Sequence, residues 1–234
     1  MCFSATVSFT AAAALAVSGV LGFYFAIKSN KRFLVLNMMA FFYALQQFSE
    51  GMIWIGSPIL SPRAWGILFL TLAFFVYPWF SALSCYCITR RENLKKKIIW
   101  VMMAGFIFGI WALSNVLLTP NLGLDQCRLH IFYNVHIMGG YKINGPLMAF
   151  LIIPIYVLLT SIPFFICDKH YSSVMGWAII VSALICWIIY FNYFISVWCF
   201  YAALISCCIT VWTSCFTPRG LLSIQHASSK KPLE

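Results

Sequence analysis

Five residues in the stretch "FFYALQQFSEGMIWIG" (41–56) have side chains that could bind a ligand. Tyr43, Gln46, Gln47, Glu50 and Trp54 recur at i, i+3, i+4, i+7 and i+11, so in a helix they share one face. The carboxylate could pair with a cation or act as a general acid or base. The two amides could form hydrogen bonds with a ligand, and the rings could form apolar walls. The spacing therefore predicts a ligand-binding face.

Glu50 is the only acidic residue within the long apolar segments of the chain. A charged side chain costs about 2.5–3.5 kcal/mol at the centre of a bilayer, so it normally faces the interior of a bundle or a wet cavity. If the helix starts at Phe33, Glu50 lies about 25 Å along it, near the opposite interface. We expect Asn115, Asn144, Ser4 and Thr6 at the same level. They predict an outward-facing pocket; the alternative is a polar network that fixes helix packing.

Cys2 offers a second kind of chemistry. Removal of Met1 would expose an N-terminal cysteine, whose amine could activate its thiol as a nucleophile. The alternative is an ordinary helix start in which Ser4 or Thr6 is the N-cap. On the outer side Cys2 could also form a disulfide with Cys127.

The composition places these residues in a membrane protein. The chain has 234 residues, of which 63% are hydrophobic and 9% are charged. A soluble domain has about a quarter charged residues. The net charge of +10 comes from short clusters between apolar runs, which is how membrane topology is set, and it does not indicate nucleic-acid binding.

The apolar segments predict an all-α integral membrane protein with seven transmembrane helices. A bilayer needs about 20 helical residues per span. Residues 173–216 contain no Asp, Glu, Lys, Arg or His, and their length fits two spans with a turn near 190–194. Six spans are the alternative if this stretch tilts or re-enters the membrane. The other spans are expected at 5–27, 33–55, 64–88, 98–118 and 146–167.

The basic residues predict the orientation of these spans. Alternating loops put 12 of the 15 Lys and Arg residues on one face and leave Arg63, Arg128 and Lys142 on the other. Basic loops stay in the cytoplasm, so the N-terminus is expected outside and the C-terminus inside. This gives a seven-span membrane domain at 1–218 and a cytoplasmic tail at 219–234. The expected location is the cytoplasmic (inner) membrane of a bacterium, with the lipid bilayer as partner.

The long outer loop, 119–145, lies between spans four and five. In "RLHIFYNVHI" (128–137) polar and apolar residues alternate, and Gly139-Gly140 follows, which predicts a β-hairpin over the outer mouth. The hairpin could be a lid or a structural cap. His130 and His136 would be roughly 20 Å apart in a strand, too far to share a metal ion, so no metal site is predicted.

Small residues predict where helices approach closely. Gly105 and Gly109 are four residues apart, as are Ser18 and Gly22, and both pairs indicate packing seams inside the bundle.

Three motifs resemble an uncharacterised family of small bacterial membrane proteins. They are "CFSATVSF" (2–9), "QQFSEGMIW" (46–54) and "NGPL" (144–147). The resemblance implies no activity or cofactor, but it implies that Cys2, Ser4, Thr6, Gln46, Gln47, Glu50, Trp54 and Asn144 belong together. A retinal-binding rhodopsin is excluded because 196–216 contain no lysine, and the seven-span zinc hydrolases because the spans lack histidines.

The sequence therefore predicts a membrane protein that binds a small molecule, lipid or cation in a polar pocket around Glu50, for transport or sensing. One alternative is a membrane-embedded enzyme with Glu50 as acid or base and Cys2 as nucleophile. The other is a structural membrane subunit without a ligand. No cofactor is predicted.

Overall fold

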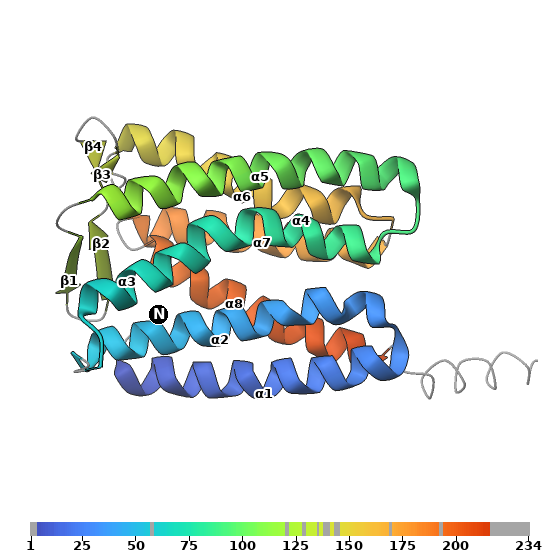
Figure 1. Ribbon diagram of the computed structural model, residues 1–234, viewed down its shortest axis with the longest axis horizontal. Helices are drawn as coiled ribbons and strands as arrows, with labels where there is room; N and C mark the ends of the chain where they lie inside the picture. Colours follow the sequence, from blue (N-terminus) through green and yellow to red (C-terminus); the bar gives the residue numbers. More distant parts are fainter. Residues whose placement is uncertain are drawn as a thin grey trace, which may run out of the picture.

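The chain forms a bundle of long helices with short strands at one end (Figure 1). The computed structural model describes residues 4–56, 59–119, 122–127, 130–134, 136–137, 141–142, 146–168, 170–191 and 194–215. The helices are α1 (Ala5–Ser29), α2 (Leu34–Trp54), α3 (Pro62–Leu70), α4 (Tyr77–Ile88), α5 (Glu92–Leu118), α6 (Pro146–Ile166), α7 (His170–Ile189) and α8 (Phe194–Cys215). A short 3-10 helix, η1 (Lys31–Phe33), precedes α2. A π-helical segment, η2 (Thr71–Val76), joins α3 to α4. Each predicted apolar segment is therefore helical, and α7 and α8 are separate helices.

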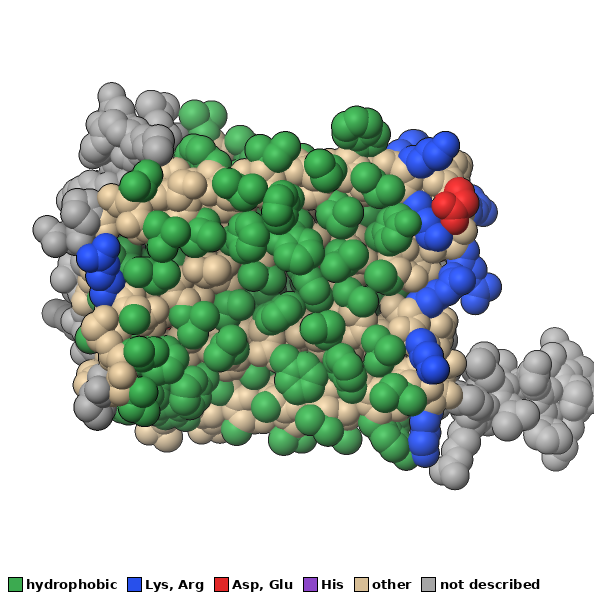
Figure 2. Space-filling view, in the orientation of Figure 1, with side chains coloured by type: hydrophobic (Ala, Val, Ile, Leu, Met, Phe, Trp, Pro, Cys, Tyr) green, Lys and Arg blue, Asp and Glu red, His purple; other side chains and the backbone are tan. Residues whose placement is uncertain are grey.

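The lengths and surfaces of the helices suggest a membrane protein. In the described part of the chain, four helical stretches are long and apolar enough to cross a bilayer, at Ala5–Ser29, Pro62–Ile88, Glu92–Leu118 and Ser172–Ile189. Two shorter apolar stretches are Phe150–Ile166 and Phe194–Thr210. Apolar side chains cover the flank of the bundle that Figure 2 shows. The exposed apolar residues of the described chain include Val17, Val20, Trp100, Ile107 and Ile188.

Lys and Arg side chains gather at one end of the bundle, opposite the strands (Figure 2). They come from the last turn of α1 and from η1 (Lys28, Lys31, Arg32), and from the α4–α5 connection and the first turns of α5 (Arg90, Arg91, Lys95, Lys96, Lys97). Arg63 lies at the other end, where its guanidinium donates a hydrogen bond to the Thr119 carbonyl at 3.1 Å. The two ends of the bundle therefore differ in charge.

Glycines allow α4 and α5 to pack closely. A Cβ on Gly105 would overlap the backbone of Pro78, and one on Gly109 would lie 2.9 Å from the Phe75 carbonyl oxygen. The predicted packing seam at Gly105 and Gly109 is confirmed, and the segments that pack against it are η2 and α4. The second predicted seam is also confirmed, because Gly22 lies against Asn37.

The described part of the 119–145 segment contains two short antiparallel strand pairs, one of which matches the predicted hairpin. Strand β2 (His130–Asn134) pairs antiparallel with β1 (Gly123–Cys127), so its partner lies upstream and not across Gly139-Gly140. A second short pair joins β3 (His136–Ile137) to β4 (Tyr141–Lys142). The β3–β4 pair joins the segments on either side of Gly139-Gly140, so the predicted hairpin is confirmed for His136–Ile137 and is wrong for β2. Alternation within a strand sets its two faces but not its partner, so the sequence did not show that β2 pairs with β1. The first pair packs on α3, where Tyr133 stacks on Phe69 with ring centroids 4.7 Å apart.

Candidate functional site

The ligand-binding face predicted on α2 faces the interior of the bundle. Gln46 and Glu50 are 0% exposed and Gln47 is 1% exposed. Tyr43 is buried, and Trp54 is half-buried against the apolar core. We call these five residues the α2 stripe. The helical period places them together, and packing against α4 and α8 removes them from the surface.

Glu50 is the only charged side chain that is buried among the described residues. The hydroxyl of Ser196 on α8 donates a hydrogen bond to its carboxylate, with 2.7 Å between the oxygens. A buried carboxylate needs such donors, because its transfer out of water costs several kcal/mol. Ser196 therefore positions the carboxylate and ties α2 to α8.

Gln46, one turn before Glu50, links three helices. Its carbonyl oxygen accepts a hydrogen bond of 2.7 Å from the hydroxyl of Tyr77 on α4. Its amide nitrogen donates to the sulfur of Cys199 on α8 at 3.1 Å. The ring of Tyr77 stacks on that of Tyr43, with centroids 4.4 Å apart. Both ends of the Gln46 amide are thus fixed within the core.

The residues of α8 that meet the α2 stripe were not among the residues predicted from the sequence. Helix α8 presents a buried line of small residues at alternating spacings of three and four, namely Ser196, Cys199, Ala203, Ser206 and Thr210. This spacing was a usable signal, because small residues at i, i+3 and i+7 mark a close helix contact. The pairs Glu50–Ser196 and Gln46–Cys199 run in opposite directions along the two helices, so α2 and α8 are antiparallel.

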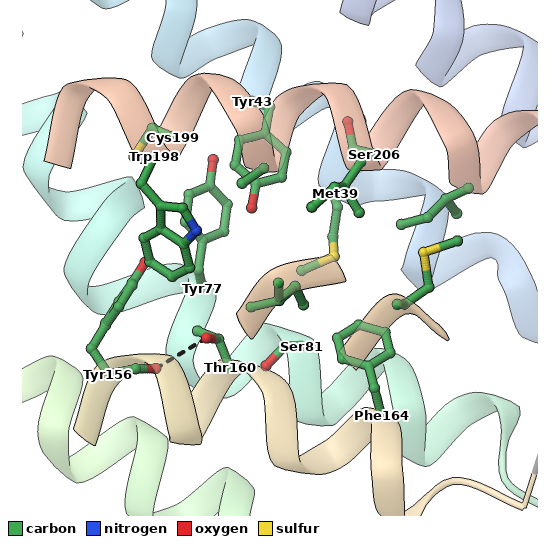
Figure 3. Close-up of a pocket in the computed structure, with 15 residues that line it drawn as sticks. Met39, Tyr43, Tyr77, Ser81, Tyr156, Thr160, Phe164, Trp198, Cys199 and Ser206 are labelled. Carbon is green, nitrogen blue, oxygen red and sulfur yellow. Dashed lines mark hydrogen bonds between the residues drawn. The ribbon is translucent and has the colours of Figure 1, made fainter. Parts of the chain in front are cut away.

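A cavity of about 40 Å³ lies beside Gln46 in the interior of the bundle. Figure 3 shows Tyr77, Tyr156 and Trp198 around one end of it and Phe164 toward the other. Side chains from α2, α4, α6, α7 and α8 line this main cavity, including the hydroxyl residues Ser81, Thr160 and Ser206. A water molecule needs roughly 10–15 Å³, and a drug-sized ligand occupies roughly 300–1,000 Å³. The main cavity as it stands therefore fits a few waters or one small chemical group.

A second cavity, of about 30 Å³, lies on the other side of Tyr156 and Trp198. Tyr156, Trp198 and Cys199 line both cavities and so form the partition between them. The Tyr156 hydroxyl donates to the Ala73 carbonyl of η2 at 2.7 Å, and the Trp198 indole nitrogen donates to the Ser182 hydroxyl at 3.1 Å. The partition is thus held by one hydrogen bond from each ring.

The remaining predicted site residues do not all gather at Glu50. Ser4 is the N-cap of α1 and accepts a hydrogen bond from the Val7 amide, which confirms that role. Thr6 is exposed and lines a groove between α1 and α8, apart from the buried carboxylate. Asn115 is buried near the end of α5, where its amide nitrogen donates to the Trp111 carbonyl at 2.7 Å. Cys2 and Asn144 lie outside the described residues.

The predicted outward-facing pocket differs from the cavities in the structure. Glu50 lines neither the main nor the second cavity. The Glu50 carboxylate is buried between α2 and α8. The main cavity is lined instead by Tyr43 and by Tyr77 and Cys199, the hydrogen-bond partners of Gln46. Within the described ranges no cluster of three or more His, Cys, Asp or Glu residues could hold a metal ion.

A family model matches residues 1–220, almost the entire chain. Its description is a family of unknown function, DUF6629. The chain belongs to this family. This agrees with the resemblance to an uncharacterised family, and the match includes every predicted site residue. No curated protein and no solved structure matches the chain.

Proposed function

We propose that the protein crosses the bacterial cytoplasmic membrane seven times, with its N-terminus outside and its C-terminus in the cytoplasm. The apolar flank and the lengths of the helices support this placement. The concentration of Lys and Arg at the α1–α2 and α4–α5 connections supports the orientation, because basic loops are retained in the cytoplasm. In this arrangement the strands lie on the outer side.

In this proposal the protein binds a small molecule inside the bundle, for transport or sensing. The observation that carries the proposal is the buried carboxylate of Glu50, one turn from Gln46, whose partners Tyr77 and Cys199 line the main cavity. An ionisable residue inside a membrane bundle is retained at a cost and commonly marks a substrate or ion site.

The lining of the main cavity narrows the chemistry of the ligand. The walls are mostly aromatic and aliphatic, including Met39, Phe164 and Trp198, and suit an apolar body. The hydroxyl of Ser81 is buried and makes no hydrogen bond to any described residue, so it is available to a ligand. We therefore expect a mostly apolar molecule with one hydrogen-bonding or positively charged group near Ser81 and Tyr77, on the side of the cavity that adjoins Gln46.

Ligand entry requires the helices to move, because both cavities are small. A molecule that passes between them must displace Tyr156 or Trp198. The hydrogen bond from Tyr156 ends on η2, and π-helical segments are frequent at functional sites. Displacement of this partition would open one cavity to the other, as transport requires.

Native mass spectrometry on protein extracted gently from its own membrane tests the proposal. Ala202 lines the main cavity, so Ala202→Phe should fill it. Ala13 is exposed on α1, so Ala13→Phe is the matched control. We expect a bound small molecule on the wild type and on Ala13→Phe, and at least a tenfold lower occupancy on Ala202→Phe. Equal occupancy in all three proteins would contradict binding in this cavity.

A structural role without a ligand is the second candidate, and one observation favours it. The described hydrogen bonds of Gln46 and Glu50 connect α2 to α4 and α8, as in a network that only fixes packing. In that case Ala202→Phe would change stability but no binding.

A further inference from the structure

A separate hollow lies at the basic end of the bundle, between the α1–α2 and α4–α5 connections. Its volume is about 390 Å³, within the usual range for ligand sites and much larger than either interior cavity. We call it the basic hollow. Its lining is Lys31, Arg32, Val35, Tyr86, Cys87, Thr89 and Lys95.

Three cationic side chains converge on this hollow from two parts of the chain. Lys31 and Arg32 come from η1, and Lys95 comes from the first turns of α5. Within the described residues, no carboxylate forms an ion pair with Lys31 or Arg32. An arginine guanidinium and lysine ammonium groups are the side chains that bind phosphate oxygens best.

Lys95 is held in place before any ligand arrives. Its ammonium group lies 2.8 Å from a carboxylate oxygen of Glu92 and 5.3 Å from the centre of the Tyr86 ring. The side chain of Lys95 is 23% exposed, whereas that of Glu92 is 76% exposed. An exposed ion pair of this kind is weak in water, so Glu92 does little to neutralise the hollow.

The charge around the hollow also favours an anion. This end of the bundle carries Lys28, Arg90, Arg91, Lys96 and Lys97 in addition to the three lining cations. The described acidic residues here are Glu92 and Asp168, and Asp168 accepts a hydrogen bond from the Arg90 backbone amide. Basic hollows between helices at the cytoplasmic face commonly hold anionic lipid headgroups.

We propose that the basic hollow binds the phosphate of an anionic phospholipid from the cytoplasmic leaflet. Arg32 and Lys31 contact the phosphate oxygens from one side and Lys95 from the other. The lipid then bridges the α1–α2 connection to the α4–α5 connection. This inference requires the membrane placement proposed above, but it is independent of ligand binding in the main cavity.

Two triple variants with the same change of charge test this site. The first is Lys31→Gln/Arg32→Gln/Lys95→Gln, which removes the lining cations. The control is Arg91→Gln/Lys96→Gln/Lys97→Gln, whose residues are exposed at the same end of the bundle but do not line the hollow. Each purified protein in dodecyl maltoside is titrated with phosphatidylglycerol or phosphatidylcholine, and bound lipid is measured by native mass spectrometry.

We expect the wild type to bind phosphatidylglycerol at least tenfold more tightly than phosphatidylcholine. The first variant should lose about tenfold in phosphatidylglycerol affinity, and the control less than threefold. Equal losses would overturn the proposal in favour of general surface charge, and so would no loss in either variant. Displacement of phosphatidylglycerol by an equal concentration of inorganic phosphate would show a site for a free anion and would also overturn it.

A smaller pair of variants covers the case in which the first triple variant does not fold. Lys31→Gln/Arg32→Gln keeps the Lys95–Glu92 contact, and Arg91→Gln/Lys96→Gln is its matched control. Lys31→Gln/Arg32→Gln should bind phosphatidylglycerol more weakly than Arg91→Gln/Lys96→Gln. Equal affinities for the two double variants would overturn the proposal.

Discussion

The hydroxyl of Ser196 donates a hydrogen bond to the carboxylate of Glu50 across 146 residues of chain. It joins α8 to α2 at the only buried charge in the described structure. This hydrogen bond fixes the position of the Glu50 carboxylate within the α2 stripe.

Removal of the Ser196 hydroxyl should destabilise the protein. In Ser196→Ala the buried carboxylate loses one donor, and we expect the free energy of unfolding to fall by about 1–2 kcal/mol. Ser206→Ala on the same helix is the control, because the Ser206 hydroxyl donates only to the Ala203 carbonyl within α8. Denaturant unfolding in detergent measures both. Equal effects would contradict a special role for Ser196.

Glu50→Gln separates the ligand proposal from the structural one. Glutamine keeps the shape of the side chain and can still accept the hydrogen bond from Ser196, so stability should change by less than about 1 kcal/mol. If Glu50 attracts the ligand, occupancy of the bound molecule in native mass spectra should fall about tenfold. Unchanged occupancy would favour the structural role.

Tyr77→Phe should weaken the link between α4 and α2. It removes the donor to the Gln46 carbonyl and leaves that buried oxygen with one partner fewer, so we expect a loss of about 1 kcal/mol. Tyr43→Phe is the control, because its hydroxyl makes no hydrogen bond to the described residues while its ring stacks on Tyr77 in the same way. Thermal unfolding followed by circular dichroism checks the difference; a larger loss for Tyr43→Phe would refute it.

Gly105→Ala should disrupt the contact between α4 and α5. The added methyl group would overlap the Pro78 backbone, which cannot move aside without shifting a helix, so a loss of about 1–3 kcal/mol is expected. Gly19→Ala is the matched control, because the atoms nearest to its methyl group would belong to the edge of the Phe41 side-chain ring, 2.9–3.0 Å away, and not to a backbone. Similar unfolding midpoints for both variants would show that α4 and α5 are not packed this closely.

Reporter fusions test the orientation. Alkaline phosphatase is active only outside the cytoplasm, whereas green fluorescent protein is fluorescent when it folds inside. Fusions after Arg63 should give active phosphatase, and fusions after Lys97 should give fluorescence. The reverse pattern would invert the proposed topology.

The sequence by itself determined the helices and the buried face of α2. Hydrophobic length and helical period are local properties, so they placed the helices and gathered Tyr43, Gln46, Gln47 and Glu50 on one face. The glycine spacing at Gly105 and Gly109 also predicted a seam correctly, because close approach of two helices requires small residues.

Only the tertiary structure decided which groups meet that face. Gln46 meets Tyr77 and Cys199, and Glu50 meets Ser196, because the order and register of packed helices bring distant segments together. The period of one helix contains no information about its neighbour. For the same reason the sequence placed Thr6 at the site although it is exposed, and it missed Tyr156 and Trp198, which separate the two cavities.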